Sequence, residues 1–115
     1  MISKKNKIQK HYFPKVLKGK RFFGEYGDFI ISPSLSEKVV HSGIIISKKY
    51  AKKAVTRNYI KRIYYRVFAQ FLLQLPIKTI VFMYKKSFTQ FNEQKFTQEL
   101  TRLLTEITLF YEKDN

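Results

Sequence analysis

The fold of this chain is constrained most by two apolar runs that flank one long amphipathic segment. The runs, at residues 39–46 and 79–84, are rich in β-branched and other apolar side chains, a composition typical of buried strands. Between them, apolar residues recur every three or four positions from near Lys52 to just before Pro76, which predicts one helix. Two strands separated by one helix indicate a crossover connection within a sheet, and the general rule favours a right-handed crossover.

The remaining segments complete a predicted order of helix, two or more strands, helix, strand, helix. They are a short helix over 11–18, an aromatic-rich turn over 22–27, a strand over 28–32 and a closing helix over 92–110. The strand at 28–32 is expected to pair antiparallel with the run at 39–46, which is the simplest arrangement. In the closing helix, Glu99 is predicted to face solvent.

The length of the chain suits a single domain. With 115 residues, 44% of them apolar, it can bury one compact core and not two. Residues 1–10 contain four lysines and few apolar side chains, which predicts a basic mobile arm ahead of one domain over 11–115. The absence of cysteine excludes disulfides and thiolate metal sites. No apolar run has the length of a signal peptide core or a membrane span, so we expect a cytoplasmic location.

The net charge of +15 is concentrated in the first half of the chain. Residues 1–62 carry 16 lysines and arginines against three acids, whereas residues 63–115 carry 7 against 5. Such a charge predicts attraction to polyanions, although by itself it does not separate RNA, DNA and anionic lipid. The binding surface is therefore expected in the first half and on the middle helix.

The predicted middle helix has a basic surface without acids. No Asp or Glu occurs from Ser47 to Leu75, whereas solvated helices normally mix both signs of charge. Arg57 falls at the edge of the apolar stripe, close to the strand end that carries Lys48 and Lys49. The residues predicted to lie opposite that stripe are Asn58, Lys61, Arg62 and Tyr65. Arginine and lysine on successive turns suit a sugar-phosphate backbone, and the alternative is an ordinary solvated helix face.

The sequence lacks a constellation of catalytic residues. His11 and His41 have no partner at metal-ligand spacing and are expected to be ordinary polar residues. The three acids of the basic half, Glu25, Asp28 and Glu37, lie in unrelated turns and do not predict a metal-dependent nuclease site. The chain also lacks a glycine-rich phosphate loop and a nucleophile elbow.

Aromatic side chains near the start of the chain are candidates for stacking on nucleic-acid bases. They are Phe13, Phe22, Phe23 and Tyr26, and core packing is the alternative for each. On the middle helix, Tyr64, Phe68 and Phe71 are predicted to be core residues.

The middle of the chain resembles the protein component of bacterial ribonuclease P. The resemblance rests on a strand that ends in Ser-Lys-Lys and on an arginine-rich helix, read here as Gly43-Ile44-Ile45-Ile46-Ser47-Lys48-Lys49 and Lys53-Ala54-Val55-Thr56-Arg57-Asn58-Tyr59-Ile60-Lys61-Arg62. Weaker similarity extends from about residue 11 to 110. Tyr59 stands where the family has a second arginine, and Tyr65-Arg66 where Arg-Glu is common, so we do not count these three residues as contacts.

This resemblance implies a fold and a function. The fold is α+β, a single domain of αβββαβα order with one central sheet packed by helices and an unusual left-handed βαβ crossover. The function is that of a subunit that assists a catalytic RNA in removing the 5′ leader from precursor tRNA. The RNA subunit and its bound Mg2+ carry out the hydrolysis, so no catalytic or metal-binding residue is expected in the protein. The implied partners are the catalytic RNA subunit and precursor tRNA, with neither DNA nor a membrane.

The motif match and the basic surface together give two groups of predicted site residues. The residues predicted to bind the RNA subunit are Lys48, Lys49, Lys53, Arg57, Asn58, Lys61 and Arg62. Phe13 and Tyr26 are predicted to bind the leader, in a cleft that the family places between the first helix and the sheet.

Three other classes of function remain open at this point. The charge alone supports a ribosome-associated or general RNA-binding protein equally well. A cationic amphipathic membrane binder is a second class, although a domain this small needs the apolar face of the 52–75 helix for its core. A free-standing protein nuclease is the third.

Overall fold

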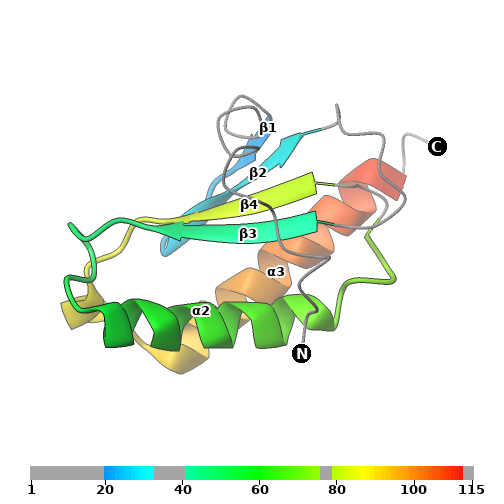
Figure 1. The fold of residues 1–115 in the computed structure, drawn as a ribbon. Coiled ribbons are helices and arrows are strands. Elements are labelled where there is room, and N and C mark those ends of the chain that lie inside the picture. Colours follow the sequence, from blue (N-terminus) through cyan, green and yellow to red (C-terminus); the bar gives the residue numbers. More distant parts are fainter. Residues whose placement is uncertain (1–19, 33–40, 76–78, 113–115) are drawn as a thin grey trace.

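A four-stranded sheet with two helices on one face forms the described part of the molecule (Figure 1). The computed structural model describes residues 20–32, 41–75 and 79–112. The elements are β1 (Lys20–Phe22), β2 (Gly27–Ser32), β3 (His41–Ile46), α2 (Ala54–Ala69), β4 (Thr79–Tyr84), the 3-10 turn η3 (Phe88–Gln90) and α3 (Glu93–Glu112). The arm predicted over 1–10 and the helix predicted over 11–18 lie outside the described residues.

The strands are arranged in the order β1-β2-β4-β3. β4 pairs antiparallel with β2, with Gly27 opposite Tyr84, and parallel with β3, with His41 opposite Thr79. The antiparallel pairing predicted between the strands at 28–32 and 39–46 is therefore wrong. β4 lies between them because it is apolar and buried along almost its whole length, which suits the centre of a sheet better than its edge. The short strand β1, which pairs with β2, adds the third early strand that the family resemblance implied.

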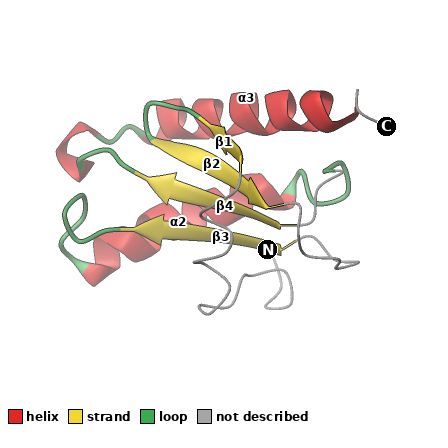
Figure 2. Cartoon of the chain, turned by 90° about the horizontal axis from the view of Figure 1, so that it is seen from above, coloured by secondary structure: helices red, strands yellow, loops and turns green. Residues whose placement is uncertain are grey.

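The connection β3–α2–β4 is a crossover between parallel strands, as the two flanking apolar runs predicted. Both strands run from right to left in Figure 1, with α2 below the sheet. Figure 2 shows the sheet from above, with β3 on the edge that faces the viewer of Figure 1 and β4 behind it. The chain therefore runs leftward along β3, returns rightward through α2 below the sheet and runs leftward again along β4, which lies behind β3. Seen from the front, this path turns counterclockwise as it moves away from the viewer, so the crossover is left-handed. The right-handed default is therefore wrong, and the hand implied by the resemblance is confirmed.

The core lies between the sheet and the two helices. Alternate residues of the central strands face the helices, among them Phe29 and Ile31 of β2 and Phe82 of β4, all fully buried. The buried residues of α2 are Ile60, Ile63, Tyr64, Val67 and Phe68, in agreement with the predicted stripe. The Tyr64 hydroxyl lies 2.7 Å from the Ser42 hydroxyl, and burial raises the pKa of Tyr64, so this pair ties α2 to β3 without a charge.

α2 ends at Ala69, well before the predicted end near Leu75. Hydrogen-bonded turns carry the chain onward, and the Leu75 amide donates to the Phe71 carbonyl at 3.1 Å. The intervening run Phe71-Leu72-Leu73 places three apolar residues in succession, which a regular helix cannot turn toward one face. In the observed turn, Phe71 and Leu72 pack against the core, and only Leu73 is fully exposed.

Glu99 of α3 is buried, so the prediction that it faces solvent is wrong. It accepts hydrogen bonds from the backbone amides of Glu25 at 2.6 Å and Tyr26 at 2.8 Å. These two amides belong to the turn between β1 and β2. A Cβ added at Gly24 would lie 2.8 Å from the Glu99 Cδ and 2.7 Å from the Gly27 carbonyl oxygen. Glycine at this position therefore allows the turn to approach α3 closely enough to bind the carboxylate.

Candidate nucleic-acid interface

The loop between β3 and α2 carries four exposed lysines on a fixed backbone. The amides of Tyr50 and Ala51 both donate to the Ser47 carbonyl, at 3.0 and 3.3 Å, and the Lys49 amide donates to the Ser47 hydroxyl at 3.2 Å. The exposed lysines of this loop, called here the lysine loop, are Lys48, Lys49, Lys52 and Lys53. Among the residues that the structure describes, no carboxylate forms a salt bridge with any of them.

Arg57 anchors the lysine loop to α2. Its guanidinium donates to the carbonyl oxygens of Ala51 at 2.9 Å and Lys52 at 2.7 Å. It therefore lies at the edge of the basic surface and close to the loop, where the sequence placed it. Two of its hydrogen bonds serve the fold, and a contact between the remaining donors and RNA stays a prediction.

The basic side of α2 faces away from the core. At 100° per residue, Asn58 and Arg62 lie nearly opposite the buried side chain of Ile60, and both are exposed. Lys61 is half-buried beside them. No acidic residue occurs in the first turn of α2, so the positive end of the helix dipole adds to the positive field here.

Tyr65 was predicted on the exposed face but is half-buried and packs against the core. Burial raises the pKa of the Tyr65 hydroxyl, and a hydrogen bond with the Ile44 backbone partly opposes this rise. Because Ile44 belongs to the edge strand β3, Tyr65 faces the edge of the sheet rather than solvent.

Tyr59, at the position of the family's second arginine, faces α3. Its hydroxyl donates to Glu93 Oε1 at 2.6 Å, and Arg66 reaches Glu93 Oε2 at 3.4 Å. The hydrogen bond from Tyr59, followed by that from Arg66, lowers the pKa of Glu93, while the hydrogen bond to Glu93 raises the pKa of Tyr59. Both residues are thus engaged in holding α2 against the start of α3, and neither was counted as an RNA contact.

Replacing Tyr59 with phenylalanine should raise the pKa of Glu93 toward its ordinary value, because the largest cause of the depression is removed. A carboxylate whose pKa is lower in the folded state stabilises the fold at pH values above its unfolded-state pKa. This contribution is lost as the pH falls through the folded-state pKa. The acid limb of the stability profile should therefore be shallower in Tyr59→Phe. An NMR titration of the Glu93 side chain tests this, with Arg102→Ala as the control that removes a cation from the pair with Glu106. An unchanged Glu93 pKa in Tyr59→Phe would contradict it.

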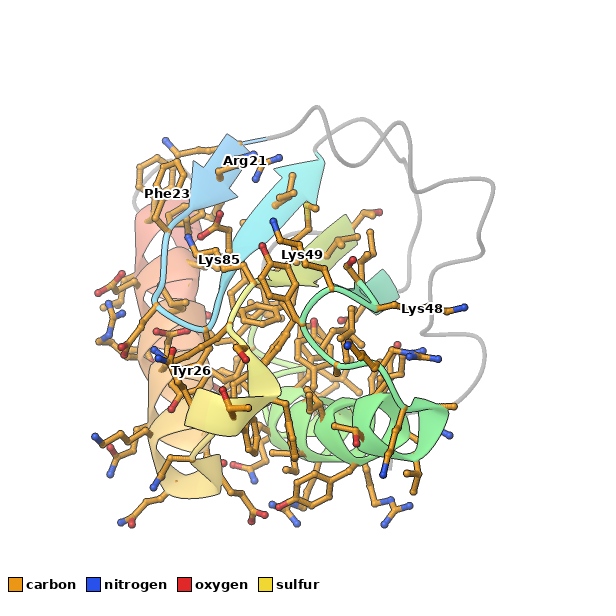
Figure 3. All side chains as sticks on the ribbon, turned by 90° about the vertical axis from the view of Figure 1, so that its left-hand side faces the viewer. Arg21, Phe23, Tyr26, Lys48, Lys49 and Lys85 are labelled. Atoms are coloured by element: carbon orange, nitrogen blue, oxygen red, sulfur yellow. The ribbon has the colours of Figure 1, made fainter. Side chains whose placement is uncertain are left out.

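A second cluster of charged residues lies on the face of the sheet away from the helices. Asp28 is buried, and its carboxylate binds Lys85 Nζ at 2.7 Å and lies 3.6 Å from the Arg21 guanidinium. These three residues border a pocket of about 220 Å³ that also includes Ser47 and Tyr50. In Figure 3, Arg21, Phe23 and Lys85 lie around β1, and Lys49 and then Lys48 follow in the direction of β3. The pocket therefore borders the lysine loop.

Of the two residues predicted to bind the leader, the structure describes Tyr26 alone. Phe13 lies outside the described residues. Tyr26 is only 2% exposed, packed against Phe91 and Phe96 below the sheet, so its ring has no open face for stacking. Of the other early aromatic candidates, Phe22 packs edge-on against Phe110, whereas Phe23 is 70% exposed. The leader contacts of Phe13 and Tyr26 remain predictions.

Sequence reasoning missed the grouping of Arg21, Asp28 and Lys85. These residues lie on three different strands or strand ends, and only the order β1-β2-β4 brings them together. The sequence carried one sign of this cluster. Successive side chains of a strand point to opposite faces of the sheet, so Asp28 lies on the face of β2 opposite to the core residue Phe29.

The described residues contain no group of three or more His, Cys, Asp or Glu side chains placed to hold a metal ion. In the same residues, no helix combines the length and apolar character that crossing a bilayer requires. The fold and the charged surfaces define a small, basic α+β protein whose lysine loop and helix face suit a polyanionic partner.

Comparison with known proteins gives the family. The Ribonuclease P family model matches residues 2–108. The ribonuclease P protein component of a Nitratiruptor species is 32% identical to this chain; the match covers 76% of this chain and 80% of the relative. That of a Picosynechococcus species is 36% identical, and the match covers 81% of this chain and 80% of the relative.

Among solved structures, a Staphylococcus aureus RNase P protein mutant with defective mRNA degradation activity has a TM-score of 0.78 at 22% identity. This match covers 89% of this chain and 87% of the other. The RNase P protein from Thermotoga maritima has a TM-score of 0.69 at 25% identity, covering 83% and 90%.

The chain belongs to the ribonuclease P family of bacterial protein components. Its role is that of the protein subunit of a ribonucleoprotein endoribonuclease in tRNA processing, which the sequence resemblance predicted.

Proposed function

We propose that the protein binds the catalytic RNA subunit of ribonuclease P through the lysine loop and the basic side of α2, and that it positions precursor tRNA for removal of its 5′ leader. The observation that carries this proposal is a set of basic residues from Lys48 to Arg62, most of them exposed, that form no salt bridge with any acid in the described part of the chain. Counterions released from an RNA backbone would supply the affinity, and the fixed loop would supply the register. The proposed contacts are Lys48, Lys49, Lys53, Arg57, Asn58, Lys61 and Arg62.

The leader is proposed to pass over the pocket bordered by Arg21, Lys85 and Ser47. Asp28 holds the two cationic heads beside the pocket, and their combined charge exceeds that of the single carboxylate. A leader phosphate would gain charge-assisted hydrogen bonds there. Phe23 is exposed, with Lys85 Nζ 5.9 Å from its ring centroid, and it offers a stacking surface for a base at the same site.

In this proposal the hydrolysis itself belongs to the RNA subunit and its Mg2+. The protein reduces the repulsion between the phosphates of the two RNA molecules, so less Mg2+ is needed to hold precursor tRNA. A cytoplasmic location is part of the proposal, since the partners are a catalytic RNA and precursor tRNA.

Reconstitution of the full chain with its RNA subunit tests the function. We expect the protein to accelerate precursor tRNA cleavage strongly at low Mg2+ and weakly at high Mg2+, because added cations take over the screening. Absence of stimulation at low Mg2+ would refute the proposal. The general RNA-binding alternative predicts equal affinity of the assembled complex for precursor and mature tRNA, whereas the proposed function predicts tighter binding of the precursor.

A further inference from the structure

A pocket of about 230 Å³ lies where the lysine loop meets the turn that follows β4. Its lining includes Lys49, Tyr50, Lys52, Lys53, Ser87 and Phe88. The two segments are fixed to each other, because the Phe88 amide donates to the Tyr50 carbonyl at 3.0 Å. In Figure 1 they lie together at the left end of the molecule, between the ends of β3 and β4 and the start of α2.

The side chain of Phe88 forms an aromatic wall of this pocket. One face of its ring is stacked on Phe91, with centroids 5.3 Å apart and planes at 20°, and Tyr59 meets the ring edge-on at 6.4 Å. Phe88 remains 36% exposed. A rigidly backed ring with an open surface is the kind of platform on which an unpaired base stacks, because ordering the ring costs no further entropy.

The charge around this platform favours an anion. Lys49, Lys52 and Lys53 line the pocket, and none of them has an ion-pair partner among the described residues. The hydroxyls of Ser87 and Thr89 contact each other at 2.9 Å beside the ring and offer hydrogen bonds to a base or a ribose. An aromatic platform beside three lysines that form no salt bridge within the described residues matches a base and its adjoining phosphates.

We propose that this pocket binds one unpaired nucleotide of the catalytic RNA subunit, with its base stacked on Phe88 and its phosphates held by Lys49, Lys52 and Lys53. The inference rests on the proposed function and deepens it. The occupant is assigned to the RNA subunit rather than to the leader because Lys53 and Thr56 connect the pocket directly to the basic side of α2. The pocket is too small for a duplex and is open enough for a single base.

The test is direct binding of the full chain to the in vitro transcribed RNA subunit, comparing wild type, Phe88→Leu and Phe110→Leu. Phe110 is the matched control: it is 39% exposed, packs edge-on against Phe22 and has Lys20 Nζ 4.0 Å from its ring centroid, yet it lies at the far end of α3. We expect Phe88→Leu to weaken binding roughly 5- to 150-fold, the range for loss of one stacked base. The salt dependence should not change, because no charge is removed. Phe110→Leu should bind like wild type.

A fluorescence measurement tests the stacking contact separately. The sequence contains no tryptophan, so Phe88→Trp would carry the sole tryptophan of the chain. Its emission should be quenched when the RNA subunit binds, and its affinity should remain within a few-fold of wild type because the ring is retained. Phe110→Trp should show no quenching. Thermal melting of each variant confirms folding before binding is measured.

The outcomes separate this inference from the function on which it rests. Failure of the wild-type chain to bind the RNA subunit would refute the proposed function and the inference together. Normal wild-type binding with equal affinities for Phe88→Leu and Phe110→Leu would overturn the inference alone. A loss for Phe88→Leu seen only with precursor tRNA, and dependent on leader length, would also overturn it, because the occupant would then be the leader.

Discussion

Replacement of both Lys61 and Arg62 with alanine is expected to reduce the salt dependence of RNA-subunit binding by roughly two units in the slope of log K against log salt. Both side chains lie on the outward side of α2, and neither has an acidic partner among the described residues. If each neutralises one phosphate, the double variant should also lose roughly 10- to 100-fold in affinity at 0.1 M salt. Titrations at several salt concentrations measure both quantities.

The control for this pair is Lys95→Ala with Arg102→Ala, which removes the same charge from α3. Lys95 and Arg102 border a different pocket, beside Glu25 and Glu99. If attraction to RNA reflects only the net charge of the protein, both double variants should change the slope equally, and the proposed interface would be refuted. A local interface predicts that the α3 variant keeps most of the wild-type slope.

Replacement of Glu99 with alanine is expected to lower the free energy of unfolding by about 2–4 kcal/mol. The substitution leaves the amides of Glu25 and Tyr26 without their acceptor in a part of the fold where Tyr26 is buried. Urea unfolding followed by circular dichroism measures the change. The same two amides should lose protection from hydrogen exchange, which locates the effect in the turn between β1 and β2.

Glu106→Ala is the matched control for Glu99, since it removes a carboxylate from the same helix. Glu106 pairs with Arg102 at 3.0 Å, but both side chains are more than half exposed, so the expected loss is below about 1 kcal/mol. Equal losses for the two variants would show that the buried carboxylate does not organise the turn. Each variant removes one negative charge, and Glu99 lines neither of the pockets that include residues of the lysine loop, so the salt dependence of RNA binding should be the same in both variants.

The sequence located the basic surface well because its signal is local. An acid-free segment on a helix with a clear apolar stripe fixes which side chains face outward, whatever the rest of the fold does. Asn58 and Arg62 are exposed for this reason, while Ile60 and Tyr64 are buried. Helical period alone does not say what packs beside the polar face, so Tyr65, half-buried near the edge of β3, was placed wrongly.

Contacts between distant segments account for the other errors. Glu99 has the spacing of a solvated residue, and its burial follows from a turn some seventy residues earlier in the chain that brings two amides to it. The pairing of β2 with β3 failed because β4, which comes last in the sequence, takes the central position. The crossover hand came from the family resemblance, since the residues alone favoured the opposite one.

The sequence by itself determined the α+β class, the parallel crossover from β3 through α2 to β4, and the basic segment from Ser47 to Arg62. Hydrophobic periodicity and charge are properties of neighbouring residues, so predictions from them hold whatever the arrangement of the helices and strands. The tertiary structure decided which distant groups share a site. It placed Lys85 beside Asp28 at 2.7 Å and brought Phe88 to the lysine loop, because the closure of the sheet and its turns, rather than any local pattern, sets those distances.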